Sequence, residues 1–215
     1  MNATAIKLTI KIWHDDCPDD PSAEDGWTLY SFSRRHGNYR DPESFQDDME
    51  FRAKLSNGLA FPLSYYEHGQ CLWALVTELP VGTNCPWDSV GHAGFIVWEQ
   101  DEENIGAKTV DDRKADARSM VDRFTQWSNG EVYGYTVEAA KVCECCKQDV
   151  ELTEEEADMD LPSCSGYYPG DIEGMVIDIK DRIGNDWADY EVSFVEQHPY
   201  GVADEVEKLW NKKEA

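Results

Sequence analysis

The sequence has few basic residues and no long hydrophobic run. It contains 19 Lys and Arg residues against 44 Asp and Glu residues, so its net charge is −25 over 215 residues. Nucleic-acid backbones and anionic membranes carry the same sign of charge, so we expect no direct binding to either. Every apolar stretch is shorter than the roughly 20 residues that cross a bilayer. The amino terminus also lacks a signal-peptide pattern, which predicts a cytoplasmic protein with reduced thiols.

No internal repeat is visible, and no glycine-rich phosphate loop opens a predicted helix, which argues against a doubly wound fold. Hydrophobic residues make up 41% of the chain, which is enough to build a core. Alternating and helical patterns are interleaved along the sequence. They predict an α+β fold, in which a mostly antiparallel β-sheet is packed by two to four helices. We expect one compact domain over residues 1–215, with an acidic, cysteine-containing hairpin or loop at 141–166 and a C-terminal helix at 200–215.

Residues 109–127 give the clearest helical pattern, because apolar side chains recur at three- and four-residue steps as far as Phe124 and Trp127. Thr109 is a suitable N-cap and Gly130 a suitable stop. A second helix is predicted over residues 42–55, with an apolar face formed by Phe45, Met49 and Leu55.

The chain has seven cysteines, an odd number that prevents complete pairing within the chain. Cys143 and Cys146 have the Cys-x-x-Cys spacing that lets two thiolates bind one zinc ion. A second such pair is missing, so Cys164 is the predicted third ligand and Cys145 a candidate fourth. The alternative is a hairpin of reduced cysteines. No cofactor other than a structural zinc is indicated.

The stretch NCPWDSVGHAGFIVW, residues 84–98, places Cys85, Asp88 and His92 close together, and His68 lies upstream. A cysteine nucleophile needs a nearby base and an electropositive setting. Here Pro86 follows Cys85 and has no backbone N–H to donate to an oxyanion. The acidic surroundings also raise the pKa of a thiol. We therefore favour a tight turn leading into a buried strand, with no catalytic residue. A hydrolase that uses Cys85, with His68 or His92 as base, is the less favoured hypothesis.

Four segments carry a resemblance to known proteins: FPLSYYEHG, CPWDSVGHAGFIV, GEVYGYTVE and SCSGYYPGD. Together they resemble the successive blocks of an uncharacterised family of bacteriophage and prophage proteins, and the similarity extends over residues 10–183. The chain departs from the family pattern at Val90, where glycine is usual, and at Ser165, where tryptophan is usual. The resemblance implies a phage protein in a host-cell cytoplasm and assigns no chemistry.

Two segments are dense in carboxylates, with six acidic residues in 15–25 and seven in 149–160. A DNA-binding protein presents a Lys- and Arg-rich groove, which a fixed array of carboxylates can occupy in place of phosphates. The predicted partner-binding residues are Asp15, Asp16, Asp19, Asp20, Glu154, Glu155, Glu156, Asp158 and Asp160.

These observations predict an acidic phage-type accessory protein that inhibits a basic host protein by mimicking DNA. The expected partner is a nuclease, a restriction or CRISPR effector, or a DNA-binding regulator. A zinc-stabilised scaffold protein and the Cys85 hydrolase are the alternatives.

Overall fold

The alternating residues near the amino terminus form a long strand, β1 (Thr4–His14), in the computed structural model. Its inward side chains, Leu8, Ile10 and Ile12, are at most 1% exposed, as the alternation predicts. The structure describes residues 4–22, 26–36, 40–41, 49–80, 83, 85–146, 148–151, 161–184, 190–197 and 201–212.

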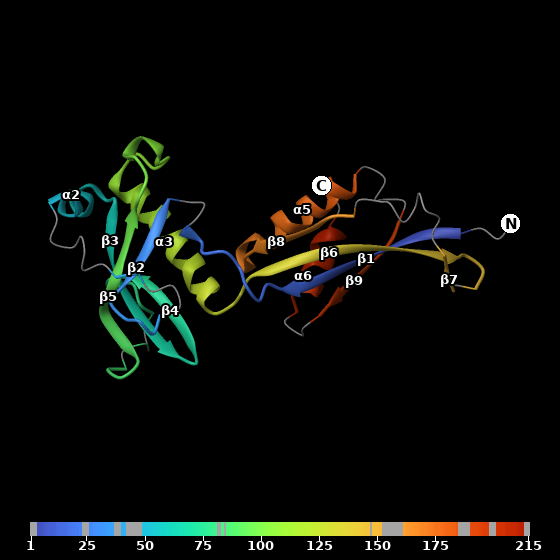
Figure 1. Ribbon diagram of the computed structural model, residues 1–215, viewed down its shortest axis with the longest axis horizontal. Helices are drawn as coiled ribbons and strands as arrows, with labels where there is room; N and C mark the ends of the chain where they lie inside the picture. The colour runs from blue at the N-terminus through green and yellow to red at the C-terminus, as the bar shows by residue number, and fades with distance from the viewer. Residues whose placement is uncertain are drawn as a thin grey trace. The chain divides into compact units, whose positions relative to one another are not determined.

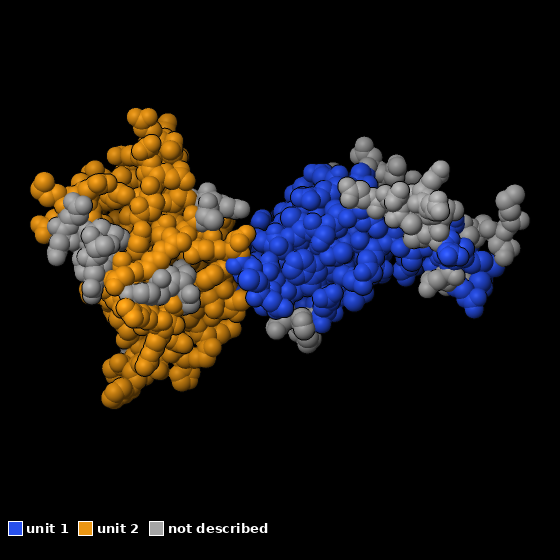
Figure 2. Space-filling view, in the orientation of Figure 1, with its two compact units in different colours: residues 1–18, 131–215 blue, residues 19–130 orange. Residues whose placement is uncertain are grey.

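The chain divides into two compact units, coloured separately in Figure 2. Unit 1 contains Met1–Pro18 and Glu131–Ala215, and unit 2 contains Asp19–Gly130. In sequence, therefore, unit 2 is an insertion between the first two strands of unit 1. Each unit has its own sheet and its own hydrophobic core.

Unit 1 is built on a sheet in which β1 is an inner strand (Figure 1). The order is β7-β6-β1-β9, and β8 also pairs with β6. All pairs are antiparallel except β1 with β9, which is parallel. The other strands are β6 (Tyr133–Cys143), β7 (Asp149–Val150), β8 (Ser163–Tyr167) and β9 (Glu191–Glu196).

Two helices, α5 (Ile172–Ile183) and α6 (Val202–Trp210), cover one face of this sheet (Figure 1). A short 3₁₀ turn, η3 (Pro169–Asp171), precedes α5. The opposite face is polar, with Lys7 3.4 Å from Glu191 and Lys11 2.5 Å from Glu138. Antiparallel sheets commonly have one face in water and one in the core.

Unit 2 contains a four-stranded antiparallel sheet in the order β2-β5-β3-β4. Helix α3 packs on one face, and Phe51 of α2 packs with Ala60 and Val97 on a separate small cluster. The elements are β2 (Trp27–Ser31), α2 (Met49–Asn57), β3 (Ala60–His68), β4 (Gln70–Leu75), β5 (Ser89–Trp98), the 3₁₀ turn η2 (Glu102–Asn104) and α3 (Val110–Ser128).

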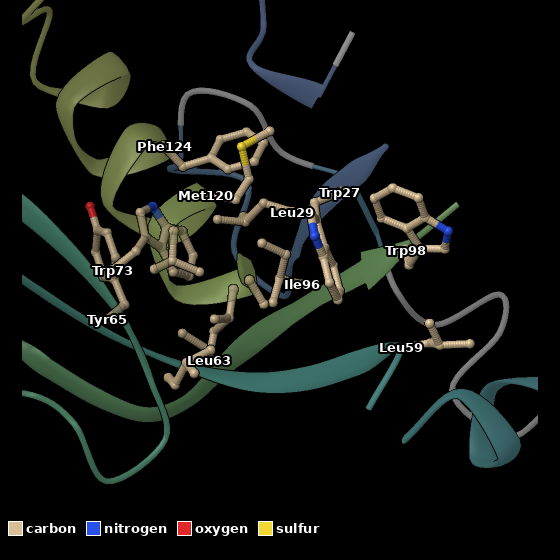
Figure 3. Close-up of a cluster of buried hydrophobic side chains, with 14 of the residues drawn as sticks. Trp27, Leu29, Leu59, Leu63, Tyr65, Trp73, Ile96, Trp98, Met120 and Phe124 are labelled. Atoms are coloured by element: carbon tan, nitrogen blue, oxygen red, sulfur yellow. The ribbon is translucent and has the colours of Figure 1, made fainter. Parts of the chain in front are cut away.

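Helix α3 begins where the sequence predicts. The Thr109 hydroxyl accepts a hydrogen bond from the Asp112 N–H at 3.1 Å, and the Asp112 carboxylate accepts from the Thr109 N–H at 3.3 Å, so both halves of a capping box are present. Met120 and Phe124 point from the helix toward the sheet, where they meet Leu29 and Ile96 (Figure 3). Phe124 is 0% exposed.

The α+β class, the mostly antiparallel pairing, the cysteine-containing loop and the C-terminal helix are confirmed. The strands form two sheets, one in each unit. The face assigned to the 42–55 helix is wrong within the described residues. Met49 is 83% exposed and Phe51 faces the core instead, while Phe45 lies outside the described residues.

Gly94 has a role that the sequence did not indicate. It lies inside β5 and is paired with Ser31 of β2. A Cβ atom placed on it would lie 1.9 Å from the Tyr30 carbonyl oxygen of β2. The close approach of two strands therefore requires glycine at this position.

Replacing Phe124 with alanine should lower the free energy of unfolding by about 3–5 kcal/mol, because the change leaves a cavity in the core of unit 2. Urea denaturation followed by tryptophan fluorescence measures this loss. Ser119→Ala, at an exposed position of the same helix, should change stability by less than about 0.5 kcal/mol. A loss below about 1 kcal/mol for Phe124→Ala would mean that another face of α3 packs on the sheet.

Candidate functional site

The CPWDS segment forms the turn that leads into β5. The Cys85 carbonyl oxygen accepts hydrogen bonds from the Asp88 N–H at 3.1 Å and the Ser89 N–H at 2.9 Å. The Ser89 hydroxyl donates to the Thr83 carbonyl oxygen. These local bonds support the interpretation of the segment as a turn before a strand.

The turn holds Trp87 in solvent, with 92% of its surface exposed. A tryptophan that becomes buried removes about 150–250 Å² from water, equivalent to about 4–6 kcal/mol at 25 cal/mol/Å². The free protein gains almost none of this stabilisation from Trp87. The indole is therefore accessible to a ligand, and tryptophan is one of the residues enriched at the energetic centre of binding interfaces.

Trp87 borders a cavity of about 520 Å³ in unit 2. The cavity lies among the end of β2 and the segment after it, the β3–β4 hairpin, and the CPWDS turn with the start of β5. Its lining combines apolar and titratable side chains, including Phe32, Arg35, His36, Tyr65, Glu67, Trp87, Asp88, Val90 and His92. Volume and composition are those of a small-ligand or side-chain site.

His36 forms part of the inner wall. It is 9% exposed, and its ring centroid lies 4.1 Å from that of Tyr65 and 4.7 Å from that of Trp73. Its Nδ1 atom is hydrogen-bonded to the hydroxyl of the fully buried Ser31. Burial lowers the pKa of His36, although the nearby Glu67 carboxylate acts in the opposite direction. The imidazole is therefore neutral at pH 7.

Glu67 and Asp88 both line the cavity, and their backbones are joined by a hydrogen bond from the Glu67 N–H to the Asp88 carbonyl oxygen at 2.9 Å. The Tyr65 hydroxyl donates to Glu67 Oε2 at 2.9 Å, and His68 Nδ1 lies 3.2 Å from Asp88 Oδ2. Burial, together with the hydrogen bond to Glu67, raises the pKa of Tyr65, so its hydroxyl keeps its proton.

The structure brings together only some of the residues of the hydrolase hypothesis. Asp88 and His92 line the cavity, and His68 contacts Asp88. Cys85 does not line the cavity, and its carbonyl oxygen accepts the hydrogen bonds that form the turn. The described lining therefore has no cysteine nucleophile, and the arrangement is suited to binding. Sequence reasoning missed His36, Tyr65 and Glu67.

The loop between β6 and β7 holds three cysteines, Cys143, Cys145 and Cys146, whose sulfur atoms all lie within 4.8 Å of one another. Cys143 is buried at the end of β6, and the other two are exposed in the turn. A hydrogen bond with Cys145 is the main cause that lowers the pKa of Cys143 to about 7. Such a group of thiols can hold a metal ion.

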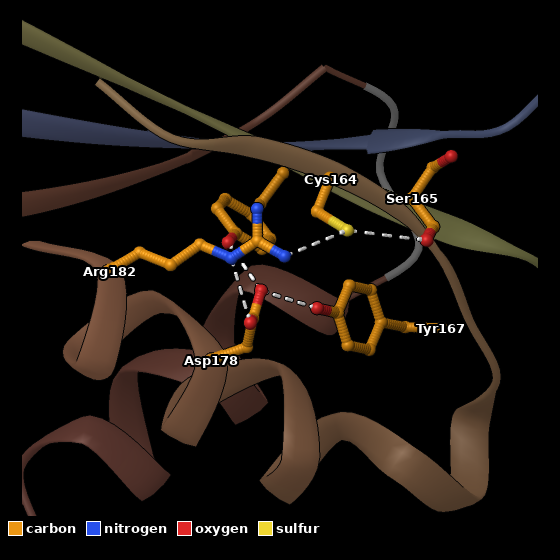
Figure 4. A network of polar contacts seen from close by, with 6 residues as sticks. Cys164, Ser165, Tyr167, Asp178 and Arg182 are labelled. Atoms are coloured by element: carbon orange, nitrogen blue, oxygen red, sulfur yellow. Dashed lines mark hydrogen bonds and ion pairs between the residues drawn. The ribbon is translucent and has the colours of Figure 1, made fainter. Parts of the chain in front are cut away.

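Cys164 does not belong to this group, which corrects the predicted ligand set. It pairs with Tyr135, eight residues before Cys143 on β6. At about 3.4 Å per residue, that places Cys164 about 27 Å along the sheet from Cys143. Its sulfur instead lies 3.8 Å from Arg182 Nη2 (Figure 4).

Arg182 belongs to a polar network that fastens α5 to the sheet (Figure 4). Asp178 Oδ2 accepts hydrogen bonds from the Tyr135 and Tyr167 hydroxyls at 2.6 and 2.7 Å, and Asp178 Oδ1 accepts from Arg182 Nε at 2.8 Å. Burial alone would raise the pKa of Asp178, but these three hydrogen bonds outweigh it and lower the pKa. The network is a structural clamp.

The first predicted acidic segment is divided between the units, with Asp15 and Asp16 in unit 1 and Asp19 and Asp20 in unit 2. Asp16 and Asp19 are exposed. Asp15 accepts from the Cys17 N–H at 3.1 Å, and Asp20 accepts from the Ser22 N–H at 2.9 Å. The second segment, with Glu154, Glu155, Glu156, Asp158 and Asp160, lies outside the described residues.

The buried His36 should make the fold sensitive to mild acid. Its pKa is lowered in the folded state, so between pH 7.5 and 5.5 the unfolded chain binds a proton that the folded chain resists. Stability should therefore fall as the pH decreases through this range. His36→Phe, which keeps an aromatic ring but cannot titrate, should start less stable and lose less stability over the same range. Urea denaturation at pH 7.5, 6.5 and 5.5 measures both slopes, and equal slopes would contradict the assignment.

Comparison with family models finds no match, and no curated protein or solved structure matches the chain significantly. The resemblance to phage proteins therefore stays a prediction. Within the described residues, no helix is both long enough and apolar enough to cross a membrane.

Proposed function

We propose that this chain is an acidic accessory protein that binds and inhibits a basic, nucleic-acid-binding protein by presenting carboxylates in place of phosphates. The resemblance to phage proteins favours a host defence factor or DNA-binding regulator as the partner. The observation that supports the proposal is that many of the few basic side chains form ion pairs within the protein.

Eight basic side chains of the described residues form ion pairs with seven acidic ones within the protein itself. For example, Arg118 and Lys114 both pair with Glu78, at 2.7 and 2.8 Å, and lower its pKa to about 2. The other pairs are Lys7–Glu191, Lys11–Glu138, Arg40–Asp20, Lys54–Glu99, Arg113–Glu102 and Arg182–Asp178.

Several other carboxylates of the described residues are exposed to solvent. Exposed carboxylates follow one another from Asp101, just before η2, through Glu103 to Asp111 in the first turn of α3. A net charge of −25 produces a strong negative potential, which attracts basic proteins and accelerates their association.

Two quadruple variants test the proposal through the predicted acidic segments. Each removes four negative charges, in Asp15, Asp16, Asp19 and Asp20 or in Glu154, Glu155, Glu156 and Asp158, with Asn and Gln as replacements. Host proteins captured by the tagged chain at low salt should be released by duplex DNA. At least one variant should bind such a purified partner more than tenfold more weakly, a loss of about 1.4 kcal/mol. The loss should shrink at high salt because of screening.

The matched control removes four charges elsewhere, in Glu173, Asp204, Glu205 and Glu207 on α5 and α6. It separates loss of net charge from loss of a particular surface. Retention of the fold in all three variants is checked by circular dichroism before binding is measured. Full binding by both test variants at low salt, or a partner that duplex DNA cannot displace, would refute the mimicry.

A zinc-stabilised accessory protein is a second candidate, favoured by the three thiols of the β6–β7 loop. Thiolates bound to a tetrahedral zinc at about 2.3 Å lie about 3.8 Å apart. The Cys143, Cys145 and Cys146 sulfur atoms already lie within 4.8 Å of one another. The lowered pKa of Cys143 favours the thiolate form that binds the metal.

Protein purified without chelator should then contain about one zinc per chain, as measured by elemental analysis. Replacing Cys145 and Cys146 together with serine should remove the zinc, whereas Cys164→Ser should retain it, because Cys164 lies far along the sheet. Less than about 0.2 zinc per chain in the unmodified protein would end this hypothesis. Loss of zinc in Cys164→Ser would restore the ligand set predicted from the sequence.

A further inference from the structure

The cavity beside the CPWDS turn gathers three large apolar side chains that are exposed in the free protein. Phe32 is 44% exposed, Trp87 92% and Val90 48%, and all three line this one cavity. They come from separate segments: Phe32 follows β2, Trp87 lies in the turn, and Val90 lies in β5. Separate segments that converge on one hollow form a surface suited to binding.

The charged groups of the cavity do not by themselves decide what it binds. Glu67 and Asp88 contribute carboxylates, with His68 against Asp88, whereas Arg35 contributes a positive charge. His36 is neutral, and His92 is exposed. The protein as a whole favours a cationic ligand, because its net charge of −25 repels anions and concentrates cations at the surface.

We propose that this cavity receives an arginine side chain of the basic partner, and this inference rests on the proposed function. A guanidinium group stacks on an exposed indole such as that of Trp87, because the face of the ring is electron-rich. Its planar fork also donates paired hydrogen bonds to a carboxylate such as Glu67. The Phe32 and Val90 side chains would cover the methylene stem. A lysine ammonium offers the charge without the planar fork, so arginine is the preferred ligand.

The probe is a blocked pentapeptide, acetyl-Gly-Gly-Arg-Gly-Gly-amide, titrated into the ¹⁵N-labelled full chain while indole and backbone amide signals are recorded by NMR. The Trp87 indole and the Gly69 amide, both at the cavity, should shift in a saturable manner. The same peptide with Lys should bind several-fold more weakly, and the peptide with Gln should not bind. AMP serves as an anionic, aromatic probe.

Trp87→Ala and Glu67→Gln should each weaken binding of the arginine peptide at least fivefold. Both residues are exposed, so the fold should be retained, which the unchanged amide spectrum of the rest of the chain confirms. Glu173→Gln, which removes the same charge from unit 1, is the matched control and should bind like the unmodified protein. Trp87→Phe should recover part of the affinity lost in Trp87→Ala.

Equal binding of the Arg and Gln peptides, preference for AMP, or full affinity in Trp87→Ala would each overturn the inference. Its failure is distinguishable from failure of the proposed function. If the peptide does not bind but duplex DNA still displaces a captured partner, the cavity is not an arginine site and DNA mimicry is still supported. If the peptide binds at Trp87 but no captured partner is displaced by DNA, the cavity is an arginine site and the mimicry falls.

Discussion

The antiparallel pairing of β1 with β6 is the constraint on which the architecture depends. Eleven residue pairs, from Thr4 with Cys143 to His14 with Tyr133, join segments separated by the whole of unit 2. For a flexible chain of roughly 120 residues, closing such a loop costs about 4 kcal/mol, which the ladder and the core beneath it must offset. Once this register is set, Tyr135 takes its place beside β8 and under α5, and Cys143 is fixed at the opposite end of the strand.

The same constraint explains what could and could not be predicted from the sequence. Strand β1 and helix α3 follow from local patterns, because alternation and a capping box act within a few residues. Cys164 was misplaced because spacing along the chain does not reveal register between strands. His36 was missed for a similar reason. Its partners Tyr65 and Trp73 lie on β3 and β4, and no sequence pattern links them to the segment after β2.

The acidic residues fall into two groups with different physical roles. Asp178 and Glu78 are enclosed by donors, so their carboxylates are stabilised in the charged form and hold elements of each unit together. The stability that Asp178 and Glu78 contribute requires the charged carboxylates. It is therefore present at neutral pH and is lost only as the pH falls through the lowered pKa values of these two groups. Other carboxylates of the described residues, such as those of Asp101 and Glu103, face water and contribute little to stability. Ion pairing cancels equal numbers of positive and negative charges, so it leaves the net charge of −25 unchanged.

Charge alone cannot make such a surface selective, because its potential is screened over about 8 Å at physiological salt and is felt by every basic protein. Selectivity needs contacts that act over a few ångströms and depend on shape. The CPWDS turn supplies a contact of this kind in unit 2. Its hydrogen bonds to the Cys85 carbonyl fix the backbone on both sides of Trp87, whose side chain lines the same cavity as Glu67 and Asp88. Under the proposed function, the surface charge would govern how quickly a basic partner arrives, and the cavity would govern which partner stays.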